Sequence, residues 1–154
     1  MQLVVLGLNH RSAAVEVRER FSFEKNEVES ALNQLYEYEK ISECVILSTC
    51  NRTEIYAVLE DVQSPKAYML DVLKHLKHAD TIDESAFFFY EEKTCIDHLF
   101  RVSASLDSLV LGEGQILSQL KGAYIAAYSA GFTGTVFNIL FQRAISVGKK
   151  VRTN

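Results

Sequence analysis

The sequence predicts an α+β fold, in which a ferredoxin-like β-α-β-β-α-β antiparallel sheet over residues 1–90 is followed by a helical part over residues 91–154. Two observations lead to this prediction. Before residue 90, four apolar runs of strand length alternate with two amphipathic helical stretches, and after residue 91 the apolar spacing stays helical. In such a sheet the first two helices cover one face.

The first part supplies the strands. Residues 2–8 form an apolar run that ends in Gly7, Asn9 and His10, which predicts a buried strand followed by a loop. Ser64 and Pro65 are suited to the N-cap and first position of a helix. The remaining elements are predicted as strands at 45–47, 55–59 and 86–90, with helices at 24–38 and from residue 65.

The second part is predicted to contain three helices. Thr94 and Asp97 are spaced as in a capping box, so the first helix should begin near them and end near Ser105. Its inward face is expected to carry Ile96, Leu99, Phe100 and Ser103. A second helix is expected over 115–129, and the last one ends in a basic stretch, as the helix dipole favours.

Composition limits the class of protein. The chain has 154 residues, 48% apolar and 23% charged, which is typical of one soluble globular domain. No apolar run reaches the roughly 18 residues of a membrane span, and the N-terminus does not resemble a signal peptide, so we expect a cytoplasmic protein without membrane contact. The net charge of −4 argues against a surface that is basic all over.

Cys50 is the first candidate for chemistry, because it lies in a polar connection between two strand-like runs. Cys44 and Cys95 fit the usual buried cysteine, and three cysteines in a reducing setting fit free thiols. Arg52, two residues after Cys50, could stabilise the nucleophilic thiolate. From these residues alone, a reactive thiol and an ordinary one both remain open.

Other polar residues could complete a site. His98 is suited to partner a thiol, although an ordinary helix histidine is the commoner case. His75 and His78 have metal-ligand spacing without further ligands nearby, so no metal site is predicted. The glycines around Glu113 lack the third glycine of a dinucleotide fingerprint, and this segment should not bind a nucleotide. Further polar side chains could line a pocket: Asp107, Ser108, Glu113, Gln115 and Gln119.

Together these motifs closely resemble the N-terminal catalytic domain of glutamyl-tRNA reductase. The resemblance spans the chain and rests on 7–11 (GLNHR), 17–20 (VRER), 48–56 (STCNRTEIY), 98–102 (HLFRV), 106–108 (LDS), 111–117 (LGEGQIL) and 148–153 (GKKVRT). Members of this family continue through an NADPH-binding domain and a dimerisation domain. Residues 1–154 are therefore interpreted as one catalytic domain of a longer enzyme, with 1–90 as its ferredoxin-like part and 91–154 as a helical part leading toward an NADPH domain that is absent here.

The resemblance implies a reaction. Cys50 attacks the ester that joins glutamate to its tRNA, and the full-length enzyme reduces the resulting glutamyl thioester with NADPH to glutamate-1-semialdehyde for tetrapyrrole (porphyrin) biosynthesis. This fragment alone should neither bind NADPH nor complete the reduction. His98 is implied in catalysis, and the implied substrate-binding residues are Thr49, Asn51, Arg52, Ser108, Glu113, Gly114, Gln115 and Gln119.

The resemblance also implies partners: glutamyl-tRNA(Glu) as substrate, a second copy in a full-length homodimer, and glutamate-1-semialdehyde aminomutase. Two other functions compete with the reductase domain. One is an RNA-binding module that stacks bases on exposed aromatic side chains of the sheet, with Phe87, Phe88 and Phe89 as candidates. The other is a cysteine hydrolase that acts on simple esters and not on tRNA.

Overall fold

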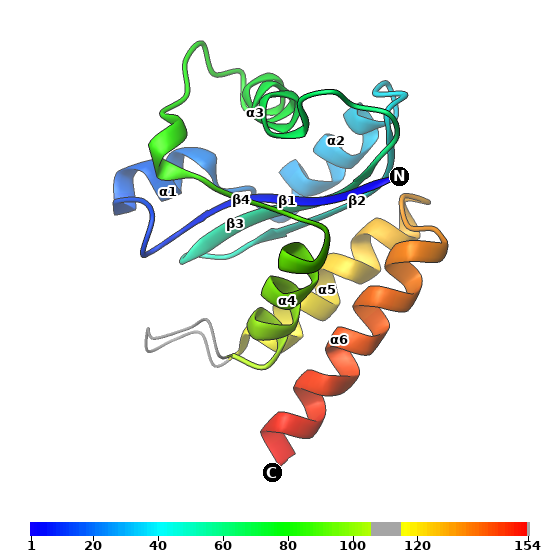
Figure 1. Cartoon of the computed structure of the whole chain (residues 1–154). Coiled ribbons are helices and arrows are strands. Elements are labelled where there is room, and N and C mark those ends of the chain that lie inside the picture. Colours follow the sequence, from blue (N-terminus) through cyan, green and yellow to red (C-terminus); the bar gives the residue numbers. More distant parts are fainter. Residues whose placement is uncertain (106–114, 154) are drawn as a thin grey trace.

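The computed structural model describes residues 1–105 and 115–153 (Figure 1). Its elements are β1 (Gln2–Asn9), α1 (Val15–Phe21), α2 (Lys25–Leu35), β2 (Ile41–Ser48), β3 (Arg52–Leu59), α3 (Pro65–Leu76), the short 3-10 helix η1 (Glu84–Ala86), β4 (Phe88–Glu91), α4 (Glu92–Ser103), α5 (Ile116–Ser129) and α6 (Thr135–Thr153). The predicted α+β class is confirmed.

The four strands form one sheet in the order β2-β3-β1-β4, and every neighbouring pair is antiparallel. This is the ferredoxin-like strand order that the sequence predicts. β1 lies in the centre, where Gly7 pairs with Glu54 of β3 on one side and with Phe88 of β4 on the other. β3, β1 and β4 therefore lie side by side at Gly7.

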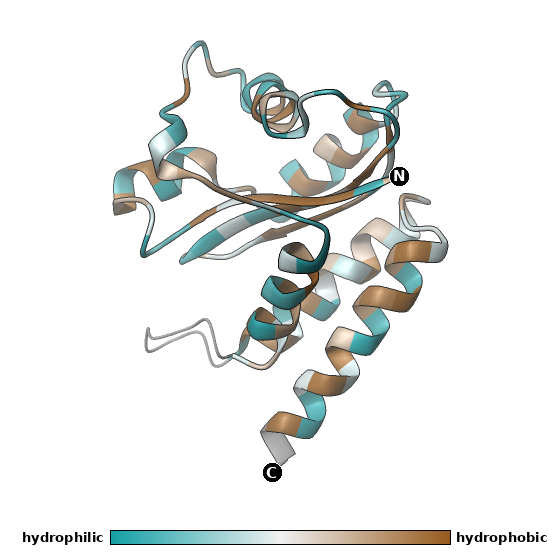
Figure 2. Ribbon diagram, in the orientation of Figure 1, coloured by the Kyte–Doolittle hydropathy of each residue, from teal (hydrophilic) through white to brown (hydrophobic). Residues whose placement is uncertain are grey.

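Helices cover both faces of the sheet (Figure 1). α2 and α3 lie on one face, as predicted, and α4, α5 and α6 lie on the other. Successive residues of a strand point to opposite faces, so Val4 and Leu6 join the core under α2 and α3 while Leu3 and Val5 join the core under the last three helices. Because both faces of the sheet are buried, the strands are apolar along most of their length, as Figure 2 shows.

Ser64 and Pro65 occupy the N-cap and the first position of α3, as predicted, although the Ser64 side chain makes no capping hydrogen bond. Two other details of the predicted helices are wrong. α1 was not expected, because its residues are mostly charged and it buries only Phe21. Thr94 is not a cap, since α4 begins two residues earlier at Glu92, whose φ of 52° turns the chain directly out of β4.

The inward face of α4 is confirmed at Leu99 and Ser103, which are buried, whereas Ile96 and Phe100 are only partly buried. Cys95 and Val102 are buried in addition. Asp97 serves no cap and pairs with Lys93 at 3.0 Å. His98 also lies on the inward face, where it is 6% exposed.

Two close contacts hold α6 in place, one with β2 and one with the end of α4. The buried carboxylate of Glu43 on β2 accepts hydrogen bonds from the backbone N–H groups of Gly134 (2.6 Å) and Phe137 (2.8 Å), and so caps the first turn of α6. Farther along α6, a Cβ on Gly148 would lie 2.5 Å from the backbone oxygen of Ser103. Within the described residues, no helix is long and apolar enough to cross a membrane.

Candidate active site

Cys50 lies at the tip of the hairpin that joins β2 to β3. The backbone N–H of Thr49 donates to the carbonyl of Arg52 at 2.8 Å, which closes the turn. The hydroxyl of Thr49 accepts from the backbone N–H groups of Asn51 (3.1 Å) and Arg52 (3.2 Å). Thr49 thus fixes the turn with its side chain as well as its backbone, and Cys50 is exposed at its apex.

Neighbouring elements hold the base of this hairpin. The hydroxyl of Ser48 accepts from the backbone N–H of Phe23 at 2.8 Å and lies 3.3 Å from the hydroxyl of Thr53. The ammonium of Lys77 donates to the carbonyl of Ser22 at 2.6 Å and lies 4.5 Å from the centre of the Phe23 ring. The segment between α1 and α2 is therefore tied both to α3 and to the Cys50 hairpin.

The other two thiols are buried, as predicted, and all three cysteines are free. Burial raises the pKa of the Cys44 thiol to about 12. Burial, and after it the negative charges of Glu54 and Glu92, also raises the pKa of Cys95. Both thiols stay protonated at neutral pH and are poor nucleophiles, so Cys50 is the one of the three that a large substrate can reach.

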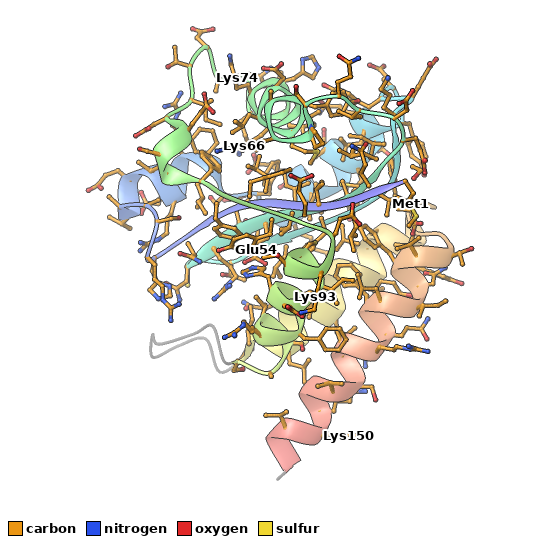
Figure 3. All side chains as sticks on the ribbon, viewed as in Figure 1. Met1, Glu54, Lys66, Lys74, Lys93 and Lys150 are labelled. Atoms are coloured by element: carbon orange, nitrogen blue, oxygen red, sulfur yellow. The ribbon has the colours of Figure 1, made fainter. Side chains whose placement is uncertain are left out.

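A polar cluster lies between β3 and α4, formed by Arg52, Glu54, Tyr56 and His98. We call it the Glu54 cluster, after the central residue, which Figure 3 labels. One oxygen of the Glu54 carboxylate, Oε2, lies 3.0 Å from Nη1 of Arg52 and 2.9 Å from Nε2 of His98. The other, Oε1, accepts from the Tyr56 hydroxyl at 2.6 Å. Glu54 itself is 0% exposed.

The partners of Glu54 keep it ionised. Burial by itself would raise the pKa of this carboxyl group, but the hydrogen bond and charge of His98, the charge of Arg52 and the hydrogen bond of Tyr56 outweigh burial and lower it. Burial, and then the charge of Glu54, raises the pKa of Tyr56 well above its usual value, so its hydroxyl stays a donor. The cluster pairs its buried charges instead of leaving them isolated.

Aromatic rings fix the other sides of His98. Its ring centre lies 4.9 Å from that of Phe88 and 5.2 Å from that of Tyr90, both on β4. His98 belongs to the second turn of α4, because the helix begins at Glu92 and not near Thr94 and Asp97 as predicted. Gly7 makes room for this arrangement, because a Cβ there would meet Phe88 at 2.6 Å and Glu54 at 3.0 Å.

The remaining predicted site residues are placed as follows. Gln115 is exposed just before α5, and Gln119 is exposed on its first turn. Gln119 and Ser48 line one cavity of about 370 Å³ between α2, β2 and α5. The structure thus brings Gln119 to the base of the Cys50 hairpin. Ser108, Glu113 and Gly114, like Asp107, lie outside the described residues.

Sequence reasoning missed Glu54, Tyr56 and Gly7. Arg52 was expected to face the thiol and a substrate carboxylate, whereas its guanidinium is 1% exposed and paired with Glu54. The signal that could have found the cluster is the alternation along β3. Arg52, Glu54 and Tyr56 are every second residue, so they share one face of a strand whose eight residues are all buried.

The fold and the site define a ferredoxin-like α+β domain with a helical second layer, which presents one exposed thiol on a hairpin beside a buried carboxylate–imidazole pair. The family described as "Glutamyl-tRNAGlu reductase, N-terminal domain" matches residues 6–154. The chain belongs to this family. The resemblance stated from the sequence motifs is confirmed.

Individual relatives agree with this assignment. The chain is 42% identical to the glutamyl-tRNA reductase of Bacillus subtilis over 97% of its own length and 33% of the relative. It is 48% identical to that of Pelotomaculum thermopropionicum, over 99% of its length and 35% of the relative. Among solved structures, the glutamyl-tRNA reductase from Methanopyrus kandleri matches 98% of the chain with a TM-score of 0.77 and 34% identity.

The chain spans about a third of the length of the relatives it matches. The match covers the N-terminal domain of the family and no more of those longer proteins. What the relatives do as whole enzymes therefore comes to this chain as a proposal.

Proposed function

We propose that this chain carries out the thiol step of a glutamyl-tRNA reductase. The observation that supports the proposal most strongly is the exposed thiol of Cys50 on its hairpin. The strand that follows carries Arg52 and Glu54, which bond to each other, and Glu54 also bonds to His98. A reachable nucleophile and an imidazole held by a carboxylate are the components that acyl transfer to a thiol requires.

In the proposed step, the thiolate of Cys50 attacks the carbonyl carbon of the ester between glutamate and the terminal ribose of its tRNA. The carbon–sulfur bond forms, the carbon–oxygen bond to the ribose breaks, and the ribose oxygen leaves with a proton. His98 supplies or relays that proton, because imidazole exchanges protons near neutral pH. The product is a glutamyl thioester on Cys50.

Recognition of the glutamyl group is assigned to the polar residues around the hairpin. Thr49, Asn51 and Arg52 belong to the turn itself, and Gln119 lies at its base. A guanidinium is suited to a carboxylate, although Arg52 already serves Glu54. We extend the proposal to the other family positions: Ser108, Glu113, Gly114 and Gln115.

The full-length enzyme, in this proposal, uses hydride from NADPH to reduce the thioester to glutamate-1-semialdehyde for tetrapyrrole biosynthesis. The antiparallel pairing of all neighbouring strands in this sheet differs from the parallel sheet of a dinucleotide-binding fold, which supports placing the NADPH site outside the described residues. No step of the proposed thiol chemistry depends on that cofactor. A homodimer and contact with glutamate-1-semialdehyde aminomutase are likewise proposed for the full-length enzyme only.

Deacylation of glutamyl-tRNA tests the proposed function. Without NADPH, the thioester can only be hydrolysed, so this chain should slowly release uncharged tRNA. The Cys50→Ser variant should lower the rate by at least about a hundredfold, the order expected for loss of a nucleophile. Release is followed by separating charged from uncharged tRNA.

Two results would count against the proposal. Equal release by the wild type and by Cys50→Ser would show that the thiol takes no part. Cleavage of simple esters together with inactivity toward glutamyl-tRNA would favour the unrelated cysteine hydrolase.

A further inference from the structure

We propose that Glu54 is a positioning residue, which holds the imidazole of His98 and the guanidinium of Arg52 in place for the chemistry of Cys50. This inference rests on the proposed function. Glu54 acts through its neighbours and does not itself touch the substrate.

Glu54 fixes which ring nitrogen of His98 carries a proton. An ionised carboxylate only accepts hydrogen bonds, so the ring nitrogen at 2.9 Å from its Oε2, Nε2, must carry a proton. Nδ1 then holds a lone pair when the ring is neutral and a second proton when the ring is charged. Since Nδ1 makes no hydrogen bond to the described residues, it is the nitrogen left to exchange protons with a substrate or water.

Glu54 also connects the helix of His98 to the hairpin of Cys50. His98 and Glu54 are separated by 44 residues and lie on α4 and β3. Arg52, bonded to the same oxygen, is the first residue of β3 after the Cys50 turn. Oε2 of Glu54 therefore links the hairpin that carries the thiol to the helix that carries the imidazole.

The buried cluster is also costly in folding free energy. Burying an arginine, a glutamate and a histidine side by side is expensive, and apolar residues of similar size often serve stability equally well. Around the cluster the sheet face is apolar, with Val5, Leu47 and Val58 in the same core. Perturbed ionisable groups of this kind gather at functional sites. Position 7 must also be a glycine for Glu54 and Phe88 to fit beside it, because a Cβ there would collide with both.

The test replaces Glu54 by glutamine, which keeps the shape and removes the charge. An amide can present a donor to His98, so the fixed proton on Nε2 should be lost in part of the molecules. We expect the maximal rate of Cys50 acylation by glutamyl-tRNA to fall about tenfold to a hundredfold, the range typical of residues that orient a ligating or catalytic histidine. The half-saturating tRNA concentration should change much less.

Glu43→Gln is the matched control. Glu43 is also a buried glutamate of the same sheet, but its carboxylate caps α6 and touches neither His98 nor Arg52. It should lower stability without changing the acylation rate of the folded protein. If Glu54→Gln does not fold, Glu54→Asp, which withdraws the carboxylate from His98 by one methylene, replaces it with the same expected direction.

A second readout is independent of the proposed function. The ¹⁵N chemical shifts of the His98 ring report which nitrogen carries the proton. We expect Nε2–H in the wild type and in Glu43→Gln, and a mixed population in the Glu54 variant. An unchanged acylation rate, or an unchanged His98 tautomer, in the folded Glu54 variant would overturn the inference. If the wild type does not react with glutamyl-tRNA at all, the proposed function fails while the tautomer measurement still decides the role of Glu54.

Discussion

At the scale of single residues, the ionised carboxyl group of Glu54 makes the stability of the domain depend on acid pH. Its pKa in the folded protein lies below the ordinary value of 4.5. A group with a lowered folded pKa stabilises the fold above its unfolded pKa and loses that contribution as the pH falls through the folded one. The contribution of Glu54 should therefore be complete near pH 7 and decline below about pH 4.5.

Urea unfolding of the wild type and Glu54→Gln at several pH values checks this. Near neutral pH the variant should be less stable by about 3 kcal/mol, the order found when one partner of a buried ion pair is removed. The difference should narrow below about pH 4.5, because Glu54 of the wild type then takes up a proton in the unfolded chain before it does so in the folded one. A difference that stays constant down to acid unfolding would show that Glu54 is not ionised in the fold.

Single residues also show what sequence reasoning can find. A cysteine between two strand-like runs is recognisable as a hairpin thiol, and its exposure follows from the polar residues around it. The alternation along β3 puts Glu54 on one face with Arg52 and Tyr56, but it does not show that Glu54 is buried, because a glutamate in a strand is usually solvent-exposed. Its partner His98 is distant in sequence, so only the packing of α4 onto the sheet reveals the pair.

At the scale of elements, two helical glycines give opposite predictions for the same substitution. Alanine is favoured over glycine in a helix by about 1 kcal/mol. On α5, a Cβ at Gly122 would meet nothing within 4 Å. On α6, a Cβ at Gly148 would lie 2.5 Å from the Ser103 carbonyl oxygen and 2.7 Å from Leu117, so α4 and α6 would have to separate.

We expect Gly122→Ala to stabilise the protein by about 0.5–1 kcal/mol and Gly148→Ala to destabilise it by about 1–3 kcal/mol. Midpoints of urea unfolding give both values from one set of measurements. If Gly148→Ala matched Gly122→Ala in stability, the close approach of α4 and α6 would be refuted.

The strands and long helices were predictable because their apolar period is strong. α1 was not, since only one of its residues is buried and no side chain caps its start. The start of α4 was also wrong, and its predicted inward face was right at Leu99 and Ser103 but not at Ile96 and Phe100. A plausible capping pair at Thr94 and Asp97 suggested a later start, whereas the structure begins the helix at Glu92 with a left-handed residue that sequence patterns rarely reveal.

At the scale of the whole molecule, the sheet is the middle layer of three, and helices of the described part of the chain cover both of its faces. The competing RNA-binding module needs aromatic side chains on an open sheet surface. Phe87 is buried in the core under α2 and α3, while Phe88 and Phe89 pack against opposite cores. The described aromatic residues of this strand therefore do not form a stacking platform.

The layered arrangement predicts that residues 1–91 do not fold by themselves. Without α4, α5 and α6, one face of the sheet would expose the apolar side chains Leu3, Val5, Val45, Leu47, Tyr56 and Val58. We expect the fragment to aggregate or to lack a cooperative thermal transition, and circular dichroism together with a ¹⁵N–¹H correlation spectrum would show it. A dispersed spectrum and a sharp transition would instead make the ferredoxin-like part an independent domain.

The central claim is that Cys50 takes the glutamyl group from glutamyl-tRNA, and its most direct test locates that group on the chain. The protein is mixed briefly with glutamyl-tRNA, quenched in acid, digested and analysed by tandem mass spectrometry. The account predicts one added glutamyl group located by the fragment ions on Cys50, and none on Cys44 or Cys95, whose thiols are buried. An unmodified Cys50 in protein that still deacylates glutamyl-tRNA would contradict it.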